Sequence, residues 1–347
     1  MRLIFMIDHM NGYGGAQRVL ANLMNEAVTR KDDVLLVLTG GTITSVYSLH
    51  SSIQVFKSEE KNKVKKVRDI RKRIKEYNPN CVISFLTLVN ILALISTLGL
   101  NVPVIISERN DPDKETKLEK ISSFLFYRFA DTVVVQTEDI AKKIRKIFHG
   151  EIRIIANPIN GHDFEKNSYD SGKNIIAVGR LNHQKNYHFM LRCFKQFLCN
   201  NPGYKLDIFG VGDLLDDLRS FSEELGIDDS VAFRGNVNNI LEREIKYDMF
   251  IMTSDFEGMP NALAEAMSVG LPCVSIDCDG GGAKELLSTD KGILVDKGDI
   301  DGFVSAMEKI AHDRNYARKI GRKAKEIKVE LSVPNIMKKW YQAINSL

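Results

Sequence analysis

The chain has 347 residues, which is more than one ordinary hydrophobic core accommodates. Of these residues 44% are hydrophobic and 27% are charged, and this composition excludes a disordered chain. Five cysteines, odd in number and without a Cys-x-x-Cys pair, argue against a disulfide framework or a zinc site. The net charge of +3 hides an asymmetry, because residues 1–157 carry 24 Lys and Arg against 17 Asp and Glu, and the other 190 carry 24 against 28. An anionic partner is therefore expected for the first half.

Short β-branched runs alternate with helical patterns along the chain, which predicts parallel sheets with helices on both faces. The first eight residues contain too short an apolar run for a signal peptide and predict a buried strand. In the first half we expect strands at 2–7, 33–38, 52–56, 80–85, 103–106, 132–135 and 152–155. Helices are expected at 15–30, 62–77, 88–99, 116–130 and 137–147. The apolar stretch 81–106 is interpreted as strand, helix and strand, since polar residues and a proline interrupt it.

A second series of alternating elements begins after a turn-rich break at residues 157–161. Its strands are expected at 174–179, 205–209, 231–234, 248–252, 273–276 and 293–295. The predicted fold class is α/β, with two doubly wound, Rossmann-like parallel-sheet domains, 1–160 and 161–330, that face each other across a cleft. Ligands of such sheets bind beyond the carboxyl ends of the strands. The last helix, 331–347, carries the only tryptophan and is expected to pack back on the first domain.

The most informative motif is the segment 255–267, which reads DFEGMPNALAEAM and follows an expected strand. Pro260 suits the first turn of a helix, whose free amides would favour an anion. Glu257 precedes this helix and Glu265 lies more than one turn inside it, so the two carboxylates would hold separate sets of hydroxyls, as on a hexose and a ribose. The alternative is an ordinary loop glutamate and a solvated helix glutamate.

A second motif, VGRLNHQKN at residues 178–186, follows the first strand of the second domain. Arg180 can form a bidentate fork with a phosphate, and Lys185 adds a point charge. Neutralising a departing diphosphate lowers the barrier to breaking a sugar–phosphate bond. Two surface cations in an ordinary loop are the alternative interpretation.

Three glycine-containing turns follow expected strands, where glycine would let the backbone approach a ligand closely. They are residues 12–18 (GYGGAQR), 209–213 (FGVGD) and 233–237 (FRGNV). The first lacks the full spacing of a dinucleotide fingerprint, and plain tight turns remain an alternative for all three.

Together these motifs resemble the retaining family 4 glycosyltransferases, whose two-domain fold is called GT-B, and the resemblance extends over essentially the whole chain. It implies that Arg180 and Lys185 hold the donor diphosphate and, with Glu257 at the donor sugar, carry the catalysis. The donor-binding residues that it implies are Gly14, Gly15, Gly210, Arg234, Val237, Gly258, Met259, Asn261, Ala262 and, at the ribose, Glu265. By the same resemblance the first domain takes the acceptor and the second takes the nucleotide sugar.

A closer likeness is to bacterial enzymes that extend glycans on polyprenyl-diphosphate carriers, through ISFL at 83–86 and VIISERN at 104–110. It implies transfer of a hexose or N-acetylhexosamine, with UDP favoured as the nucleotide, to a lipid-linked glycan in surface polysaccharide or glycoconjugate synthesis. Many relatives have a histidine near the position of Arg109. Arginine cannot act as a base, so an electrostatic or positioning role is expected for Arg109, beside Glu108 on the acceptor side.

Nine of the fifteen residues at 61–75 are Lys or Arg, around an apolar helical stripe. One interpretation is an ordinary amphipathic helix with solvated cations. The other is a helix that faces anionic lipid or a lipid diphosphate, with Lys65, Arg68 and Lys72 as acceptor-side cations. The expected location is the cytoplasm, with peripheral contact at the inner face of the plasma membrane under the second interpretation.

No metal or other cofactor is expected besides the nucleotide-sugar substrate. Two Asp-x-Asp triplets, at 111–113 and 277–279, spell a metal motif of the other major glycosyltransferase fold, but ordinary turns explain them. The seven histidines show no metal-ligand spacing. The glycines at 280–282 open a helix that either lies beside the donor or forms a plain turn.

Three rival functions share some of these features. A nucleotide-sugar epimerase on the same fold would need an acid/base set, which the sequence does not supply. A non-enzymatic module that binds anionic membrane or nucleic acid through residues 61–75 is opposed by the acidic second half and by the lack of interleaved aromatics, so nucleic acid is not an expected partner. For a nicotinamide dehydrogenase the glycine loop is incomplete.

Overall fold

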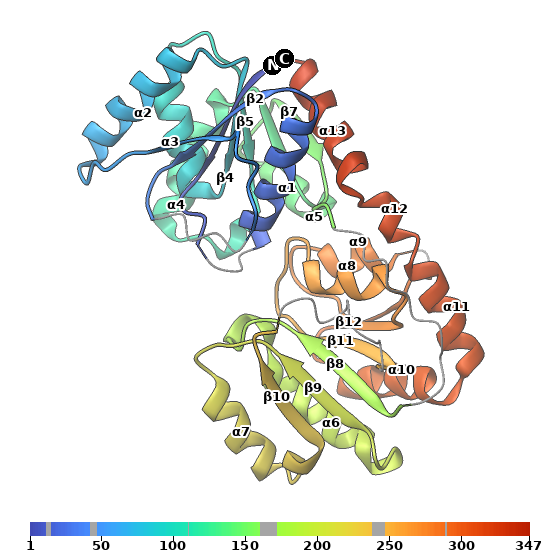
Figure 1. Cartoon of the computed structure of the whole chain (residues 1–347). Helices are drawn as coiled ribbons and strands as arrows, with labels where there is room; N and C mark the ends of the chain where they lie inside the picture. The colour runs from blue at the N-terminus through green and yellow to red at the C-terminus, as the bar shows by residue number, and fades with distance from the viewer. Residues whose placement is uncertain (12–14, 42–46, 110, 160–171, 238–246, 289) are drawn as a thin grey trace. The chain divides into compact units, whose positions relative to one another are not determined.

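The computed structural model describes the chain except for residues 12–14, 42–46, 110, 160–171, 238–246 and 289. The chain divides into two compact units, and each is built on one parallel sheet with helices on both faces (Figure 1). The first unit comprises Met1–Pro158 and Val333–Leu347, and the second comprises Ile159–Ser332. The α/β class with two parallel-sheet domains, predicted from the alternation of strands and helices, is confirmed.

The first unit contains a seven-stranded sheet in the order β3-β2-β1-β4-β5-β6-β7. Its strands are β1 (Arg2–Ile7), β2 (Asp33–Leu38), β3 (Gln54–Lys57), β4 (Cys81–Phe85), β5 (Val104–Ser107), β6 (Thr132–Val135) and β7 (Glu151–Ile154). The strand order reverses between β1 and β4, which pair in parallel from Leu3 opposite Cys81. Such a reversal opens a crevice at the carboxyl ends of the two strands.

The helices of the first unit connect these strands, and one helix comes from the C-terminus. They are α1 (Gly15–Thr29), α2 (Lys63–Tyr77), α3 (Thr87–Thr97), α4 (Lys117–Phe126), α5 (Glu138–Ile144) and α13 (Val333–Asn345), with 3-10 turns η1 (Pro112–Lys114) and η2 (Tyr127–Phe129). Side chains cap three of these helix starts, since Asn62 caps α2, Thr137 caps α5 and Thr116 forms a capping box with Glu119 on α4. The apolar stretch 81–106 forms β4, α3 and β5, as predicted.

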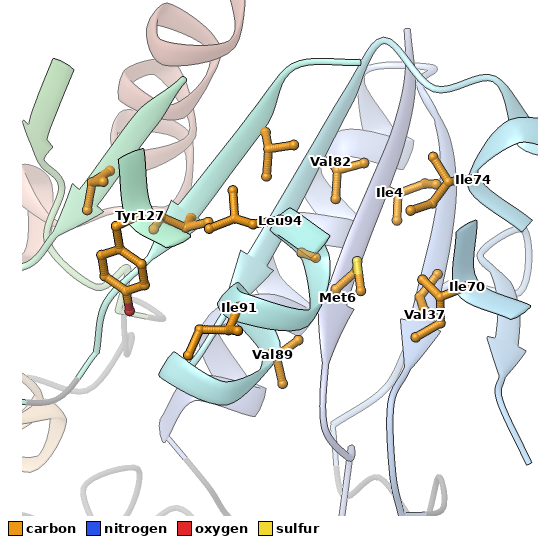
Figure 2. Packing of buried hydrophobic residues seen from close by; sticks show 14 of the residues in the cluster. Ile4, Met6, Val37, Ile70, Ile74, Val82, Val89, Ile91, Leu94 and Tyr127 are labelled. Atoms are coloured by element: carbon orange, nitrogen blue, oxygen red, sulfur yellow. The ribbon is translucent and has the colours of Figure 1, made fainter. Parts of the chain in front are cut away.

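One face of the first sheet is covered by α2 and α3, whose apolar stripes pack on the strands (Figure 2). Ile70 and Ile74 of α2 lie near Val37 of β2, and Leu94 of α3 belongs to the same buried cluster. The strands are nearly continuous apolar runs because both of their faces are covered by helices.

The C-terminal helix α13 belongs to the first unit, where it packs against α1. Its Trp340 is buried and stacks on Phe85 at the end of β4, with ring centroids 5.8 Å apart and planes at 21°. Tyr341 donates a hydrogen bond to Asp32, which also binds the N-terminal ammonium group of Met1. The last residues of the chain thus complete the core of the first unit.

The second unit contains a six-stranded sheet in the order β10-β9-β8-β11-β12-β13. Its strands are β8 (Asn174–Val178), β9 (Lys205–Phe209), β10 (Val231–Gly235), β11 (Met249–Met252), β12 (Cys273–Ile276) and β13 (Ile293–Val295). Its helices are α6 (Tyr187–Asn200), α7 (Leu215–Glu224), α8 (Asn261–Ser268), α9 (Gly282–Leu287), α10 (Ile300–His312), α11 (Arg314–Ala324) and α12 (Ile327–Glu330), with 3-10 turns η3 (His183–Lys185) and η4 (Asp228–Ser230). Here the order reverses between β8 and β11. Among the described residues of both units, no helix has the length and apolar character needed to span a membrane.

Candidate functional site

The loops that follow β8, β9 and β10 are joined by backbone hydrogen bonds at the carboxyl edge of the second sheet. The amide of Leu181 donates to the carbonyl of Val211 over 3.0 Å, and the amide of Gly210 donates to Gly235 over 2.8 Å. Gly210 has φ +147°, and a Cβ there would lie 1.8 Å from the carbonyl oxygen of Gly179. Only glycine allows this approach, so the turns predicted around Gly210 and Arg234–Val237 lie together with the start of the Arg180 loop.

An ion pair joins the two main motifs across the strand reversal. The Nζ of Lys185 lies 2.5 Å from Oε1 of Glu257, and their side chains are only 18% and 12% exposed. Lys185 ends η3 after β8, and Glu257 lies in the loop after β11, the neighbouring strand. The sequence separates these residues by 72 positions, and the strand order brings their charges into contact.

Backbone and amide hydrogen bonds hold the two loops in this position. Gln184 accepts from the amide of Asp255 over 2.8 Å, and its Nε2 donates to the carbonyl of Phe256, also over 2.8 Å. The hydroxyl of Thr253 donates to the carbonyl oxygens of Lys185 and Asn186 at 3.1 Å. Because the backbone on both sides of the ion pair is anchored, the position of its charges is determined by the fold.

The charge of Glu257 also acts on buried groups nearby. Burial, and to a smaller extent the Glu257 carboxylate, raises the pKa of the Cys278 thiol to about 12. Burial and Glu257 likewise raise the pKa of Tyr187, whose hydroxyl donates to the carbonyl of Gly179 over 3.1 Å. Neither group ionises near neutral pH, so neither adds a second negative charge beside Glu257.

Arg180 is exposed at the same sheet edge, two residues after β8. Its guanidinium makes no hydrogen bond or ion pair with the part of the chain that the structure describes. A solvated guanidinium beside the loops of Gly210 and Lys185 can take up an anionic ligand without first breaking an internal ion pair.

The helix α8 begins at Asn261, directly after Pro260, and no side chain caps its first turn. Met259 is buried, Gly258, Asn261 and Ala262 are half-buried, and Glu265 is half-buried in the second turn. The positive end of the helix dipole therefore lies beside the Glu257 loop, where it favours a negative ligand.

The glycine run at 280–282 packs directly against the Glu257 loop. A Cβ on Gly280 would lie 2.3 Å from the carbonyl oxygen of Glu257, and one on Gly282 would lie 1.9 Å from that of Gly258. The amide of Glu257 donates to the carbonyl of Asp279 over 2.8 Å. The glycines thus allow the close contact that positions the backbone of Glu257.

Lys297, which the motifs did not reveal, joins the same two loops from the end of β13. Its Nζ donates to the carbonyl of Asp255 over 3.1 Å and lies 3.4 Å from the Asp255 carboxylate and 3.6 Å from that of Asp279. The sequence signal that could have pointed to Lys297 is its position shortly after a strand of the same sheet. It carries no motif of its own.

Lysines neutralise both Asp-x-Asp triplets. Lys143 lies 2.6 Å from Asp111 and 2.8 Å from Asp113, and Lys284 lies 3.3 Å from Asp277. Within the described ranges, no three His, Cys, Asp or Glu side chains form a group that could hold a metal ion. Independence from metal remains a prediction.

Four donor-side residues of the predicted set lie at the margin of this arrangement, in the first unit or outside the described residues. Arg234 is half exposed and pairs with Asp207 at 2.9 Å, and Val237 is half-buried beyond it. Gly15 is the exposed first residue of α1 in the first unit, and Gly14 lies outside the described residues.

The predicted acceptor-side residues Glu108 and Arg109 are both buried after β5 in the first unit. Glu108 accepts hydrogen bonds from the hydroxyl of Tyr127 at 2.5 Å and from that of Thr87 at 3.2 Å. The Arg109 guanidinium donates to Asn157 over 2.6 Å and lies 4.5 Å from the Phe85 ring centroid. Burial lowers the pKa of Arg109 to about 9, so it stays charged at neutral pH. These contacts fit a positioning role for both.

Glu115, which the motifs did not reveal, shares the Thr87 hydroxyl with Glu108 and accepts its hydrogen bond at 2.8 Å. Burial, and then the charge of Glu108, raises the pKa of Glu115 from 4.5 to about 7, whereas Lys120 acts in the opposite direction.

The contribution of Glu115 to stability should therefore fall as pH rises from about 4.5 through 7, because the ionised Glu115 is less favoured in the folded than in the unfolded state. Glu115→Gln should gain stability relative to wild type at pH 8 but not at pH 4.5. Urea unfolding at both pH values measures this, with exposed Glu60→Gln as the control. An equal difference from wild type at both pH values would contradict the prediction.

The basic helix α2 contains two kinds of cation. Lys66 donates to the carbonyl of Thr39 at 2.5 Å, and Arg71 donates to carbonyls at the end of α3, so these two stabilise the fold. Lys65, Arg68 and Lys72 are exposed, and within the described ranges only Lys72 among them forms an ion pair, with Glu76 at 3.9 Å. The three cations that were predicted to lie on the acceptor side are thus exposed, unlike Lys66 and Arg71.

Two family models match successive parts of the chain. The model described as "Glycosyltransferase Family 4" matches residues 13–162, and that described as "Glycosyl transferases group 1" matches residues 159–327. Together they extend over most of both units.

Two curated relatives and one solved structure illustrate the similarity. A Campylobacter jejuni enzyme, GalNAc-alpha-(1->4)-GalNAc-alpha-(1->3)-diNAcBac-PP-undecaprenol alpha-1,4-N-acetyl-D-galactosaminyltransferase, is 27% identical over 99% of this chain and 98% of its own. The UDP-Gal:alpha-D-GlcNAc-diphosphoundecaprenol alpha-1,3-galactosyltransferase of Escherichia coli is 29% identical over 52% of this chain and 51% of its own. The crystal structure of Anabaena HepE in complex with UDP aligns over 100% of both chains with a TM-score of 0.87 at 17% identity, which shows a shared GT-B fold.

Proposed function

Because the chain belongs to the glycosyltransferases of group 1 and family 4, we propose that it transfers a hexose or N-acetylhexosamine from a nucleotide-diphosphate sugar to a glycan, with retention of configuration. The observation that carries the proposal is the Lys185–Glu257 ion pair at the strand reversal of the second sheet, beside exposed Arg180 and the start of α8. This arrangement offers two cations and a helix dipole to a diphosphate, and a carboxylate to sugar hydroxyls.

In this proposal the bond between the sugar C1 and the phosphate oxygen breaks, and the departing diphosphate keeps the electron pair. Arg180, Lys185 and the first amides of α8 stabilise the charge that develops there. The acceptor hydroxyl attacks C1 from the same face, and its proton passes to the departing phosphate oxygen. Glu257 orients the sugar, and Glu265 binds the ribose.

We propose UDP as the nucleotide and a lipid-linked glycan as the acceptor, in bacterial surface polysaccharide or glycoconjugate synthesis. The names of the two relatives, which refer to undecaprenol-linked substrates, and the UDP complex of HepE support this proposal. In the first unit, Lys65, Arg68 and Lys72 on α2 offer exposed charge to the diphosphate of such an acceptor.

UDP release from a panel of UDP-sugars, with and without a short-chain polyprenyl-diphosphate glycan, tests the proposed function. We expect one donor to yield UDP and a longer glycan only when the acceptor is present. Conversion of the donor sugar without acceptor would instead identify an epimerase. No turnover of any donor in the panel, with acceptor present and the protein folded, would contradict the proposal.

Turnover should be unchanged in EDTA, because Arg180, Lys185 and the α8 dipole supply the positive charge that a metal would otherwise provide. The measurement is the rate of UDP release in a saturating excess of EDTA and after addition of Mg²⁺ or Mn²⁺. A loss of turnover in EDTA that either metal restores would disprove metal independence.

A further inference from the structure

The helix α4 and the turn η2 expose an unusual number of large apolar side chains. Within residues 118–129 five such side chains are between 41% and 71% exposed, namely Leu118, Ile121, Phe124, Leu125 and Phe129. Scattered exposed apolar residues are normal on a protein surface, but this set falls on a single helix and the turn that continues it. We call this set the α4 surface.

Most of the large apolar side chains of α4 lie on its solvent side. Its buried side contains Ser123 and the partly buried Phe126, and leads to Tyr127, whose hydroxyl binds Glu108. Leu118, Ile121 and Leu125 recur at three- and four-residue intervals, so they share the opposite face. The apolar face of the helix therefore points away from the core of the first unit.

Three cations lie on α4 and η2 beside this face. Lys117, Lys120 and Arg128 are exposed, and none of them forms an ion pair with a described residue. Lys120 donates to the carbonyl of Asp113 and Arg128 donates to that of Leu125. The single acid of α4, Glu119, is held in the capping box with Thr116.

We propose that the α4 surface docks on an anionic lipid bilayer, with its apolar side chains in the acyl boundary and its cations at lipid phosphates. The positive charge of these cations complements the negative charge of lipid phosphates, which favours a lipid leaflet as the occupant of this surface. The helix α3 packs against both α2 and α4, so the exposed cations of α2 belong to the same group of helices as the α4 surface (Figure 1). The inference goes beyond the proposed function, since it requires no particular donor or acceptor.

Vesicle flotation with the full chain tests the proposal. We expect wild type to float with phosphatidylcholine vesicles that contain phosphatidylglycerol, and the triple variant Leu118→Ser, Ile121→Ser, Leu125→Ser to float about tenfold less. The matched control is Val211→Ser with Val329→Ser, which removes exposed apolar side chains from the second unit and should float like wild type. Equal flotation of wild type and the triple variant would overturn the proposal.

A spectroscopic test reports directly on insertion. Trp340 is the only tryptophan and is buried, so Leu125→Trp adds a reporter against a nearly constant background. Its emission should shift to shorter wavelength with the anionic vesicles and be quenched by lipids brominated along the acyl chain. An unchanged spectrum would contradict docking through this surface.

Two further measurements separate the remaining outcomes. Wild type that is dimeric without lipid, and becomes monomeric in the triple variant, would assign the surface to a second copy and overturn the proposal. The triple variant should keep wild-type turnover of a water-soluble acceptor. Flotation without any sugar transfer would contradict the proposed function and leave this inference standing.

Discussion

Lys185→Ala is expected to lower kcat/KM for the nucleotide sugar by about 10²- to 10³-fold, the usual cost of removing one group that stabilises developing charge. The variant loses the cation that balances Glu257 at 2.5 Å, and in the proposed mechanism it loses a cation at the departing diphosphate. Steady-state UDP release with acceptor saturating measures this effect. Lys205→Ala, at the opposite edge of the same sheet, is the matched control and should keep wild-type kinetics.

Two roles are open to Lys185, namely pairing with Glu257 alone and contact with the donor. A double variant distinguishes them. Glu257→Gln removes the uncompensated charge that Lys185→Ala leaves behind, so the double variant should recover stability. We expect it to remain catalytically impaired, because the departing phosphate still lacks its cation and the sugar lacks the Glu257 carboxylate. Recovery of both stability and turnover in the double variant would show that Lys185 acts only through Glu257.

Trp340→Ala is expected to destabilise the first unit by about 3 to 5 kcal/mol, the usual range for removing a large buried aromatic side chain. It removes the stack on Phe85 and opens a cavity beside Arg109, whose guanidinium lies 5.9 Å from the Trp340 ring centroid. Urea unfolding followed by circular dichroism is the measurement, since the variant has no tryptophan fluorescence.

Two variants of α13 serve as controls for this prediction. Trp340→Phe keeps an aromatic ring against Phe85 and should lose less stability than the alanine variant. Lys339→Ala changes an exposed neighbour and should stay within about 0.5 kcal/mol of wild type. A loss below about 1 kcal/mol for Trp340→Ala would mean that α13 adds little to the core of the first unit.

Much of the fold could be predicted from the sequence because its signals are local. Strands in covered parallel sheets are short apolar runs, and the helices between them show a period near 3.6 residues. The expected strand at 33–38 and the expected helix at 62–77 therefore agree with β2 and α2 to within one residue. The two motifs proposed to bind the donor could also be recognised in the sequence, since each directly follows a strand.

Contacts between distant residues could not be predicted in this way. The burial of Arg109 depends on Trp340, which lies in the last helix of the chain, and Glu115 and Lys297 belong to no motif. The helix at 116–130 was expected, but no local signal indicated that its apolar face is exposed. In α4 the contacts with α3 decide instead that this face is exposed.

The sequence by itself determined the alternation of strands and helices and the two motifs that carry the candidate chemistry, because both depend on residues close together in the chain. Only the tertiary structure decided that Lys185 meets Glu257. The chain passes from β8 through β9 and β10 before β11 returns to the side of β8, and this strand order brings two loops 72 residues apart into contact. Which charges neutralise one another, and which apolar face stays exposed, follow from such long-range packing.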